Sequence, residues 1–141
     1  MVKKEILDIS SDLKKMGDVR NFVRDFCKNI ADSVLDEGRI DLIELAVHEA
    51  VVNIIKHAYG EKAGEPIQIN ANLSDQKLVF CIYDQGESFD PEEVPFPEFD
   101  GSKDGGFGVY IITQSFDEVS YTQEKNGENC VCLKVNLTGG K

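Results

Sequence analysis

The sequence has no long apolar run and no basic cluster, and each absence excludes a class of protein. No stretch approaches the roughly 20 apolar residues that a membrane-spanning helix needs, and the first ten residues lack the apolar centre of a signal peptide. Lys and Arg number 15 against 26 Asp and Glu, which gives a net charge of -11. Because nucleic-acid binders present a basic face, we expect a cytoplasmic protein that contacts neither nucleic acid nor a membrane.

Two further absences concern metals and nucleotides. The four cysteines (Cys27, Cys81, Cys130 and Cys132) include no C-x-x-C pair, and no second Cys/His pair lies near the C-x-C in the sequence. We therefore expect mostly buried free thiols, with neither a metal site nor a disulfide framework. The G-x-x-x-x-G-K-[ST] pattern is also missing, which excludes a P-loop. A nucleotide site in this chain would have to be built in another way.

The order of apolar patterns predicts a single α+β domain over residues 1–141. Alternating and helically spaced apolar residues predict strands at 2–9, 67–73, 77–84, 118–123 and 130–137, and helices at 13–34, 40–59 and 107–116. Residues 85–105 hold three of the four prolines and many acids, which predicts a long functional loop. We expect a two-layer sandwich, with helices covering one face of a mixed, mostly antiparallel sheet.

Glu49 and Asn53 are the first candidate site residues, both within the second predicted helix. Residues four apart lie on one helical face. A carboxylate there can accept a proton from an attacking hydroxyl, and an amide oxygen can bind a hard cation such as Mg2+. An ordinary polar helix face would look the same, so this pair alone does not identify a site.

Two glycine-containing stretches complete the pattern. Asp84 ends an apolar strand, where it could accept a hydrogen bond from the amino group of adenine, and Gly86 permits close approach of the backbone to a flat ligand. Gly106 and Gly108 precede an apolar helix start, whose free N–H groups suit a phosphate. Each stretch has a plain alternative, an Asp/Gly turn or a hinge, but their order describes an ATP site with an intervening lid.

Three segments carry a resemblance to a known superfamily. ELAVHEAVVNIIKHAYG, DQGESFD and GGFGVYII resemble the N box and the two glycine motifs of the GHKL ATPases, over roughly residues 5–137. FDEV after the last predicted helix makes the chain similar to the anti-sigma-factor serine kinases. The resemblance implies the Bergerat ATP-binding fold, ATP and Mg2+ as cofactors, and serine/threonine kinase activity. It also implies a homodimer that phosphorylates a STAS-domain anti-anti-sigma protein and binds a sigma factor.

The same resemblance implies a role for each matching residue. Glu49 would be the general base, Asn53 would ligate Mg2+, Asp84 would bind the adenine amino group, and Gly86 would line the purine. Residues 87–104 would form the ATP lid. The remaining cofactor-binding residues would be Lys103, Gly105, Gly106, Phe107 and Gly108.

Departures from the family pattern favour an alternative function. Ser88 stands where many relatives have a glycine, and Asn129 lies near a position that is often Thr. The predicted lid carries seven carboxylates and one base, Lys103, which would repel a triphosphate unless most face solvent. The alternative is a partner-switch binding module that senses nucleotide without transferring phosphate. The catalytic domain of a sensor histidine kinase is disfavoured, because His48 and His57 lie within the N-box helix.

Overall fold

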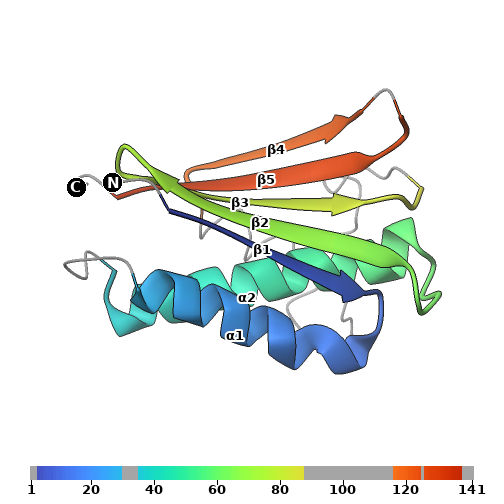
Figure 1. Cartoon of the computed structure of the whole chain (residues 1–141), viewed down its shortest axis with the longest axis horizontal. Helices are drawn as coiled ribbons and strands as arrows, with labels where there is room; N and C mark the ends of the chain where they lie inside the picture. Colours follow the sequence, from blue (N-terminus) through green and yellow to red (C-terminus); the bar gives the residue numbers. More distant parts are fainter. Residues whose placement is uncertain (1–2, 30–34, 88–115, 125, 138–141) are drawn as a thin grey trace, which may run out of the picture.

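The computed structural model describes residues 3–29, 35–87, 116–124 and 126–137. They form two layers, a five-stranded sheet and a pair of helices that lie across one of its faces (Figure 1). The elements in chain order are β1 (Lys3–Ser10), η1 (Leu13–Lys15), α1 (Met16–Lys28), α2 (Glu37–Asn53), η3 (Ile54–Ala58), β2 (Pro66–Ser74), β3 (Lys77–Asp84), β4 (Glu118–Gln123) and β5 (Asn129–Asn136). The five predicted strands and the second helix are confirmed. The first helix is confirmed in part: α1 ends at Lys28, whereas the prediction ran from 13 to 34, and residues 30–34 lie outside the described part of the chain. The predicted helix at 107–116 also lies almost wholly outside it.

The sheet has the strand order β1-β2-β3-β5-β4. Every pairing between described strands is antiparallel, so the expected parallel component is not found in this part of the chain. A two-residue turn joins β2 to β3, and its residues Asp75 and Gln76 both have positive φ, 53° and 64°. Such turns match the twist of the strands they connect. β5 lies between β3 and β4, which places the last hairpin beside the end of β3.

The core lies between the sheet and the helices and follows from the alternation of side chains along each strand. Phe80 and Ile82 of β3 are completely buried, whereas Cys81 and Tyr83, which alternate with them, face the opposite side and are partly exposed. Phe26 of α1 meets Phe80 edge to face, with ring centroids 6.0 Å apart. One face of the sheet is therefore packed against helices, which confirms the predicted two-layer sandwich.

An arginine on α1 ties this helix to α2. The Arg24 guanidinium donates to Glu44 at 2.8 Å and to Glu37 at 3.1 Å, and it also donates to Asp41. At the start of α2 the Asp36 side chain accepts a hydrogen bond from the Arg39 N–H at 2.7 Å, which satisfies one of the donors left free at a helix start. These contacts fix the position of the helix that carries Glu49 and Asn53.

The second predicted helix is not α-helical to its end. The α-helix stops at Asn53 and continues as the π-helical turn η3, in which the Tyr59 N–H donates to the Ile54 carbonyl at 3.0 Å. Such π-helical insertions occur frequently at functional sites. None of the described helices is long and apolar enough to cross a membrane.

A disulfide corrects the expectation from the cysteine pattern. Cys81 of β3 and Cys132 of β5 are directly opposite each other in the antiparallel register, with Cα atoms 4.1 Å apart, and their sulfurs are bonded. The two residues are 51 apart in the sequence, and their proximity depends on β5 pairing with β3 in this one register. They lie on the face of the sheet that the helices do not cover, not in the core as the apolar neighbours suggested.

Candidate functional site

Asp84 is the centre of the candidate site. It ends β3 with only 4% of its surface exposed and is the sole carboxylate in the buried class among the described residues. Its Oδ1 accepts hydrogen bonds from the Gly86 N–H at 2.9 Å and from the Asn129 side-chain amide at 3.0 Å. Within the described part of the chain no recorded hydrogen bond uses Oδ2, which leaves this oxygen available to accept from a ligand.

Burial sets the electrostatics of this carboxyl group. Desolvation raises the pKa of Asp84 above the ordinary value for Asp, and the hydrogen bonds from Asn129 and Gly86 lower the pKa and offset part of this rise. The ionised carboxylate therefore carries a net cost in the folded protein. A charge retained at such a cost is typical of functional sites.

Asn129 positions the carboxylate from the neighbouring strand. Besides its bond to Asp84, its side-chain amide nitrogen donates to the Gly86 carbonyl at 2.9 Å. One side chain thus fixes both the carboxylate and the turn that follows it. The sequence placed Asn129 near the adenine pocket but did not reveal this direct contact with Asp84. The contact depends on the β3–β5 register, which places Asn129 opposite Asp84.

Gly86 is required by its contact with the end of η3. A Cβ atom at this position would lie 2.4 Å from the carbonyl oxygen of Ala58, and the next N–H, of Glu87, donates to that same oxygen at 2.8 Å. The sequence predicted close approach of the backbone to a ligand. The close approach that the structure has is to the Ala58 backbone, and contact with a purine stays a prediction.

We expect Gly86→Ala to destabilise the fold by about 1–3 kcal/mol, the usual cost of overpacking. The backbone of Ala58 cannot move away without disturbing the turn η3. Gly17→Ala is the matched control, because an added Cβ there meets no described atom within 4 Å, and Ala in a helix is favoured over Gly by roughly 0.5–1 kcal/mol. Urea denaturation of both variants measures the difference. Equal midpoints for the two would show that the Gly86 contact is not a constraint.

Tyr59 supports the same turn and was not singled out from the sequence. Its hydroxyl accepts a hydrogen bond from the Gln85 N–H at 2.7 Å and donates to the Pro66 carbonyl at 2.6 Å. Burial raises the pKa of Tyr59, mainly by desolvation, so the hydroxyl keeps the proton that it donates. This residue joins the end of the N-box segment to the start of β2 and to the turn after β3.

Asn53 has an unsatisfied polar atom inside the protein. The residue is 3% exposed, and its Nδ2 has no hydrogen-bond partner among the described residues. Buried amides are normally satisfied, and rotation of the group by 180° exchanges N for O, so either atom can face a ligand. Since an amide oxygen is a good ligand for a hard cation, Asn53 fits the Mg2+ role that the sequence analysis gave it.

A cavity of about 120 Å³ joins the elements of the site. It is lined by Ile54, Asp84, Tyr121, Thr122, Gln123, Asn129, Cys130 and Val131. Ile54 directly follows Asn53, so the cavity connects the start of η3 with the end of β3 and the β4–β5 hairpin. The buried amide oxygen of Asn129, a cavity-lining residue, has no hydrogen-bond partner in the described segments. The walls thus combine apolar surface with a few polar atoms, as small-molecule sites do.

Glu49 lies one helical turn before Asn53 on α2, as predicted. It is partly buried, and its Oε2 is 3.3 Å from Nδ1 of His48. The sequence analysis mentioned His48 only to argue against a histidine kinase. A hydrogen bond to the imidazole would hold the Glu49 carboxylate in place, which gives His48 a positioning role.

Several predicted site residues lie outside the described part of the chain. These are Lys103, Gly105, Gly106, Phe107 and Gly108, together with Ser88 and the rest of the proposed lid from 88 to 104. Their roles stay predictions. Hydrogen bonds join Asp84, Gly86 and Asn129, and Ile54, the residue after Asn53, lines the same cavity as Asp84 and Asn129.

The chain is similar to a family of ATPase domains and to several known proteins. A family model described as histidine kinase-like ATPase domain matches residues 9–135. Two similar proteins are named serine-protein kinase RsbW. The one from Oceanobacillus iheyensis is 29% identical over 93 residues, and the one from Staphylococcus aureus is 35% identical over 94 residues. Each match covers 60% of this chain and 59% of the relative. The chain therefore spans about three fifths of the length of these relatives. In the solved Acinetobacter baumannii histidine kinase AdeS the match covers 99% of this chain and 70% of that one, with 15% identity and a TM-score of 0.49.

Proposed function

The chain belongs to the histidine kinase-like ATPase domain family, and from this premise we propose that it is an ATP-dependent protein-serine/threonine kinase. The observation that carries the proposal is the buried Asp84 carboxylate, whose Oδ1 is held by two donors while Oδ2 is left for a ligand. The name of the similar proteins, serine-protein kinase RsbW, supports a protein substrate.

In this proposal Asp84 and Asn53 bind the nucleotide from two sides. Oδ2 of Asp84 accepts a hydrogen bond from the adenine amino group, and Asn129 keeps the carboxylate oriented for it. Asn53 offers its amide oxygen to Mg2+, which when bound neutralises charge on the phosphates. The buried unsatisfied amide of Asn53 supports this assignment.

Glu49 acts on the protein substrate. The substrate hydroxyl oxygen attacks the γ-phosphorus, the bond from that phosphorus to the β–γ bridging oxygen breaks, and ADP leaves. The hydroxyl proton passes to the Glu49 carboxylate, and His48 positions that carboxylate from 3.3 Å. The products are ADP and a phosphoserine or phosphothreonine on the partner.

The proposed partners come from the resemblance to the anti-sigma-factor serine kinases. The substrate would be a STAS-domain anti-anti-sigma protein, and the unphosphorylated substrate would compete with a sigma factor for this chain. We also propose a cytoplasmic homodimer. Ile6 on the edge strand β1 is 61% exposed and Leu13 just after it 59%, which offers apolar surface for a second subunit.

The direct test supplies γ-labelled ATP and Mg2+ together with a STAS-domain protein from the same genome. Label on a serine or threonine of that protein supports the kinase. The alternative, a nucleotide-sensing module without transfer, is favoured by the seven carboxylates between residues 87 and 104. ATP binding without any transfer of label would support the alternative.

We expect ATP affinity to fall as the pH is lowered through the raised pKa of Asp84, because the protonated carboxyl loses an acceptor for the adenine amino group. The stability of the fold should depend on pH in the opposite way to ATP affinity. Because the pKa of Asp84 is higher in the folded than in the unfolded protein, the stabilisation from the protonated carboxyl is complete at low pH and is lost as the pH rises through the folded pKa. Calorimetric titrations across acidic pH, in the native chain and in Asp84→Asn, isolate the effect. An identical pH profile in both would contradict it.

A further inference from the structure

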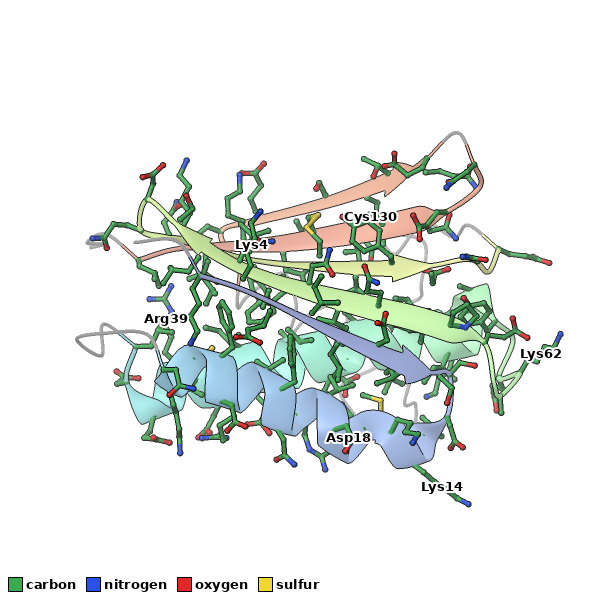
Figure 2. All side chains as sticks on the ribbon, in the orientation of Figure 1. Lys4, Lys14, Asp18, Arg39, Lys62 and Cys130 are labelled. Atoms are coloured by element: carbon green, nitrogen blue, oxygen red, sulfur yellow. A yellow bond between two sulfur atoms is a disulfide. The ribbon has the colours of Figure 1, made fainter. Side chains whose placement is uncertain are left out.

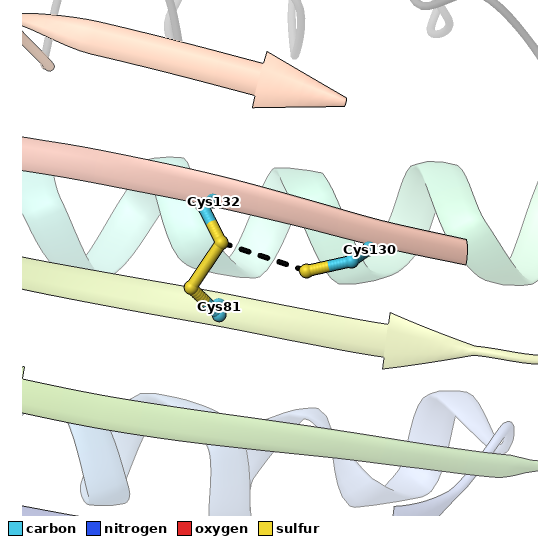
Figure 3. Close-up of a disulfide and its surroundings, with 3 residues drawn as sticks. All are labelled: Cys81, Cys130 and Cys132. Atoms are coloured by element: carbon cyan, nitrogen blue, oxygen red, sulfur yellow. Dashed lines mark hydrogen bonds between the residues drawn. A yellow bond between two sulfur atoms is a disulfide. The ribbon is translucent and has the colours of Figure 1, made fainter. Parts of the chain in front are cut away.

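Three cysteines converge on the face of the sheet that carries no helix. Cys81 on β3 and Cys130 and Cys132 on β5 have sulfur atoms that all lie within 4.8 Å of one another. Figure 3 shows the bonded pair Cys81–Cys132 with Cys130 beside it, its sulfur 3.5 Å from that of Cys132. In Figure 2 the disulfide and Cys130 lie on the side of the sheet away from α1 and α2.

The cluster follows from two simple features of the fold. Cys130 and Cys132 are two residues apart on one strand, so they share a face. The β3–β5 register then places Cys81 directly opposite Cys132. Cys81 and Cys132 are partly exposed and Cys130 is 6% exposed, so the site is lined by protein but can be reached from solvent.

We propose that the reduced cluster is a binding site for a soft, thiol-seeking cation, Zn2+ or Cu+. Thiolates are the preferred ligands of both ions. Three sulfurs each about 2.3 Å from a tetrahedral zinc lie about 3.8 Å from one another, close to the 3.5 Å between the sulfurs of Cys130 and Cys132. Once reduction breaks the Cys81–Cys132 bond, those two sulfurs also move apart, to at least van der Waals contact. Small side-chain rotations in the reduced protein would meet this geometry without any movement of the strands.

The surroundings of the cluster suit a cation. Asn70 on β2 pairs with Cys81 on the same outer face, and its buried amide oxygen has no hydrogen-bond partner in the described part of the chain. This oxygen can accept from a metal-bound water or complete the ligand set. The carboxylates of Glu124 and Glu128 add negative potential at Cys130. A bound cation would offset that charge.

The disulfide and the metal exclude each other, because sulfurs bonded to each other are not thiolates. Reduction by a thiol or dithiol breaks the Cys81–Cys132 bond. It adds two electrons and two protons to the pair, while the reductant becomes a disulfide. The cation then displaces protons from the three thiols. Metal uptake therefore depends on the redox state of the protein.

The test uses the full chain reduced without oxygen by a tertiary phosphine, which becomes its oxide with oxygen from water. After desalting, Zn2+ is titrated against a chromophoric chelator, and Cu+ is titrated separately against a Cu+-specific chelator. We expect one equivalent of at least one ion to bind, and no tight binding to the oxidised chain. Failure of both ions to bind, or a disulfide that persists in reductant, would overturn the proposal.

Variants separate the cluster from other ligands. Cys81→Ser, Cys130→Ser and Cys132→Ser should each weaken binding by about 100-fold or more, because loss of a residue that only supports a ligand already costs roughly 10- to 100-fold. Cys27→Ala is the matched control, because Cys27 is 3% exposed in the core beneath the other face of the sheet. Binding that survives in all three serine variants would belong to the carboxylates of this acidic chain and would contradict the site. Circular dichroism of each variant confirms that the sheet is intact.

Discussion

Asp84→Asn is expected to lower the affinity for ATP by roughly 30- to 150-fold, a loss of about 2–3 kcal/mol. The amide keeps an oxygen at Oδ1, where it still accepts from Gly86 and Asn129. The second oxygen becomes an NH2 group, a donor that faces the amino donor of adenine. The variant thus preserves the local hydrogen bonds and removes only the acceptor that we propose for the adenine amino group. Isothermal calorimetry with Mg-ATP measures the change.

Stability provides an independent check on the same substitution. Because burial raises the pKa of Asp84, the neutral amide should leave the free energy of unfolding at neutral pH equal or higher. Asp75→Asn is the control, since it makes the same exchange at the β2–β3 turn, beyond the other end of β3, where a positive φ of 53° suits Asn. Unchanged ATP affinity in Asp84→Asn would contradict the assignment of the adenine contact.

Glu49→Gln is expected to reduce phosphoryl transfer by about 10²- to 10⁴-fold, the usual contribution of a general base. The glutamine has the same shape but cannot accept the substrate proton. ATP affinity should change by less than about 2-fold, because in the proposed mechanism this residue acts on the substrate hydroxyl and not on the nucleotide. Single-turnover transfer of labelled phosphate, together with calorimetry, separates the two effects.

The control for this variant is Glu37→Gln, which makes the same exchange near the start of the same helix. Its carboxylate is 70% exposed, and Arg24 keeps its contacts with Glu44 and Asp41 when Glu37 is changed, so α2 stays in place and transfer should proceed at the native rate. A native rate in Glu49→Gln would show that another group accepts the proton. His48, 3.3 Å from Glu49, would then be the next residue to substitute.

The elements set by local pattern could be predicted from the sequence. β2 and β3 alternate apolar and polar residues across a two-residue turn, and β4 and β5 flank Asn126-Gly127. The two-residue repeat and the turn residues were therefore sufficient to predict both hairpins. The π-helical turn η3 was not predicted. Its residues continue the apolar spacing of α2, so no local pattern marks the change, which shows only in the hydrogen bond from the Tyr59 N–H to the Ile54 carbonyl.

Contacts between distant strands account for most of what the sequence did not reveal. Asn53, Asp84 and Gly86 were recognisable from motif and resemblance, because each lies in a short characteristic segment. The bond from Asn129 to Asp84 and the convergence of Cys81 with Cys130 and Cys132 both depend on the β3–β5 register. That register joins segments about 50 residues apart, and no local pattern specifies it.

The most direct test of the account is calorimetric titration of the native chain with ATP, in the presence and absence of Mg2+. The site built from Asn53 and Asp84 predicts binding that is saturable at millimolar ATP or below and that weakens strongly when Mg2+ is withheld. Absence of heat and of competition at millimolar Mg-ATP would contradict the central claim that this buried carboxylate and amide form a nucleotide site.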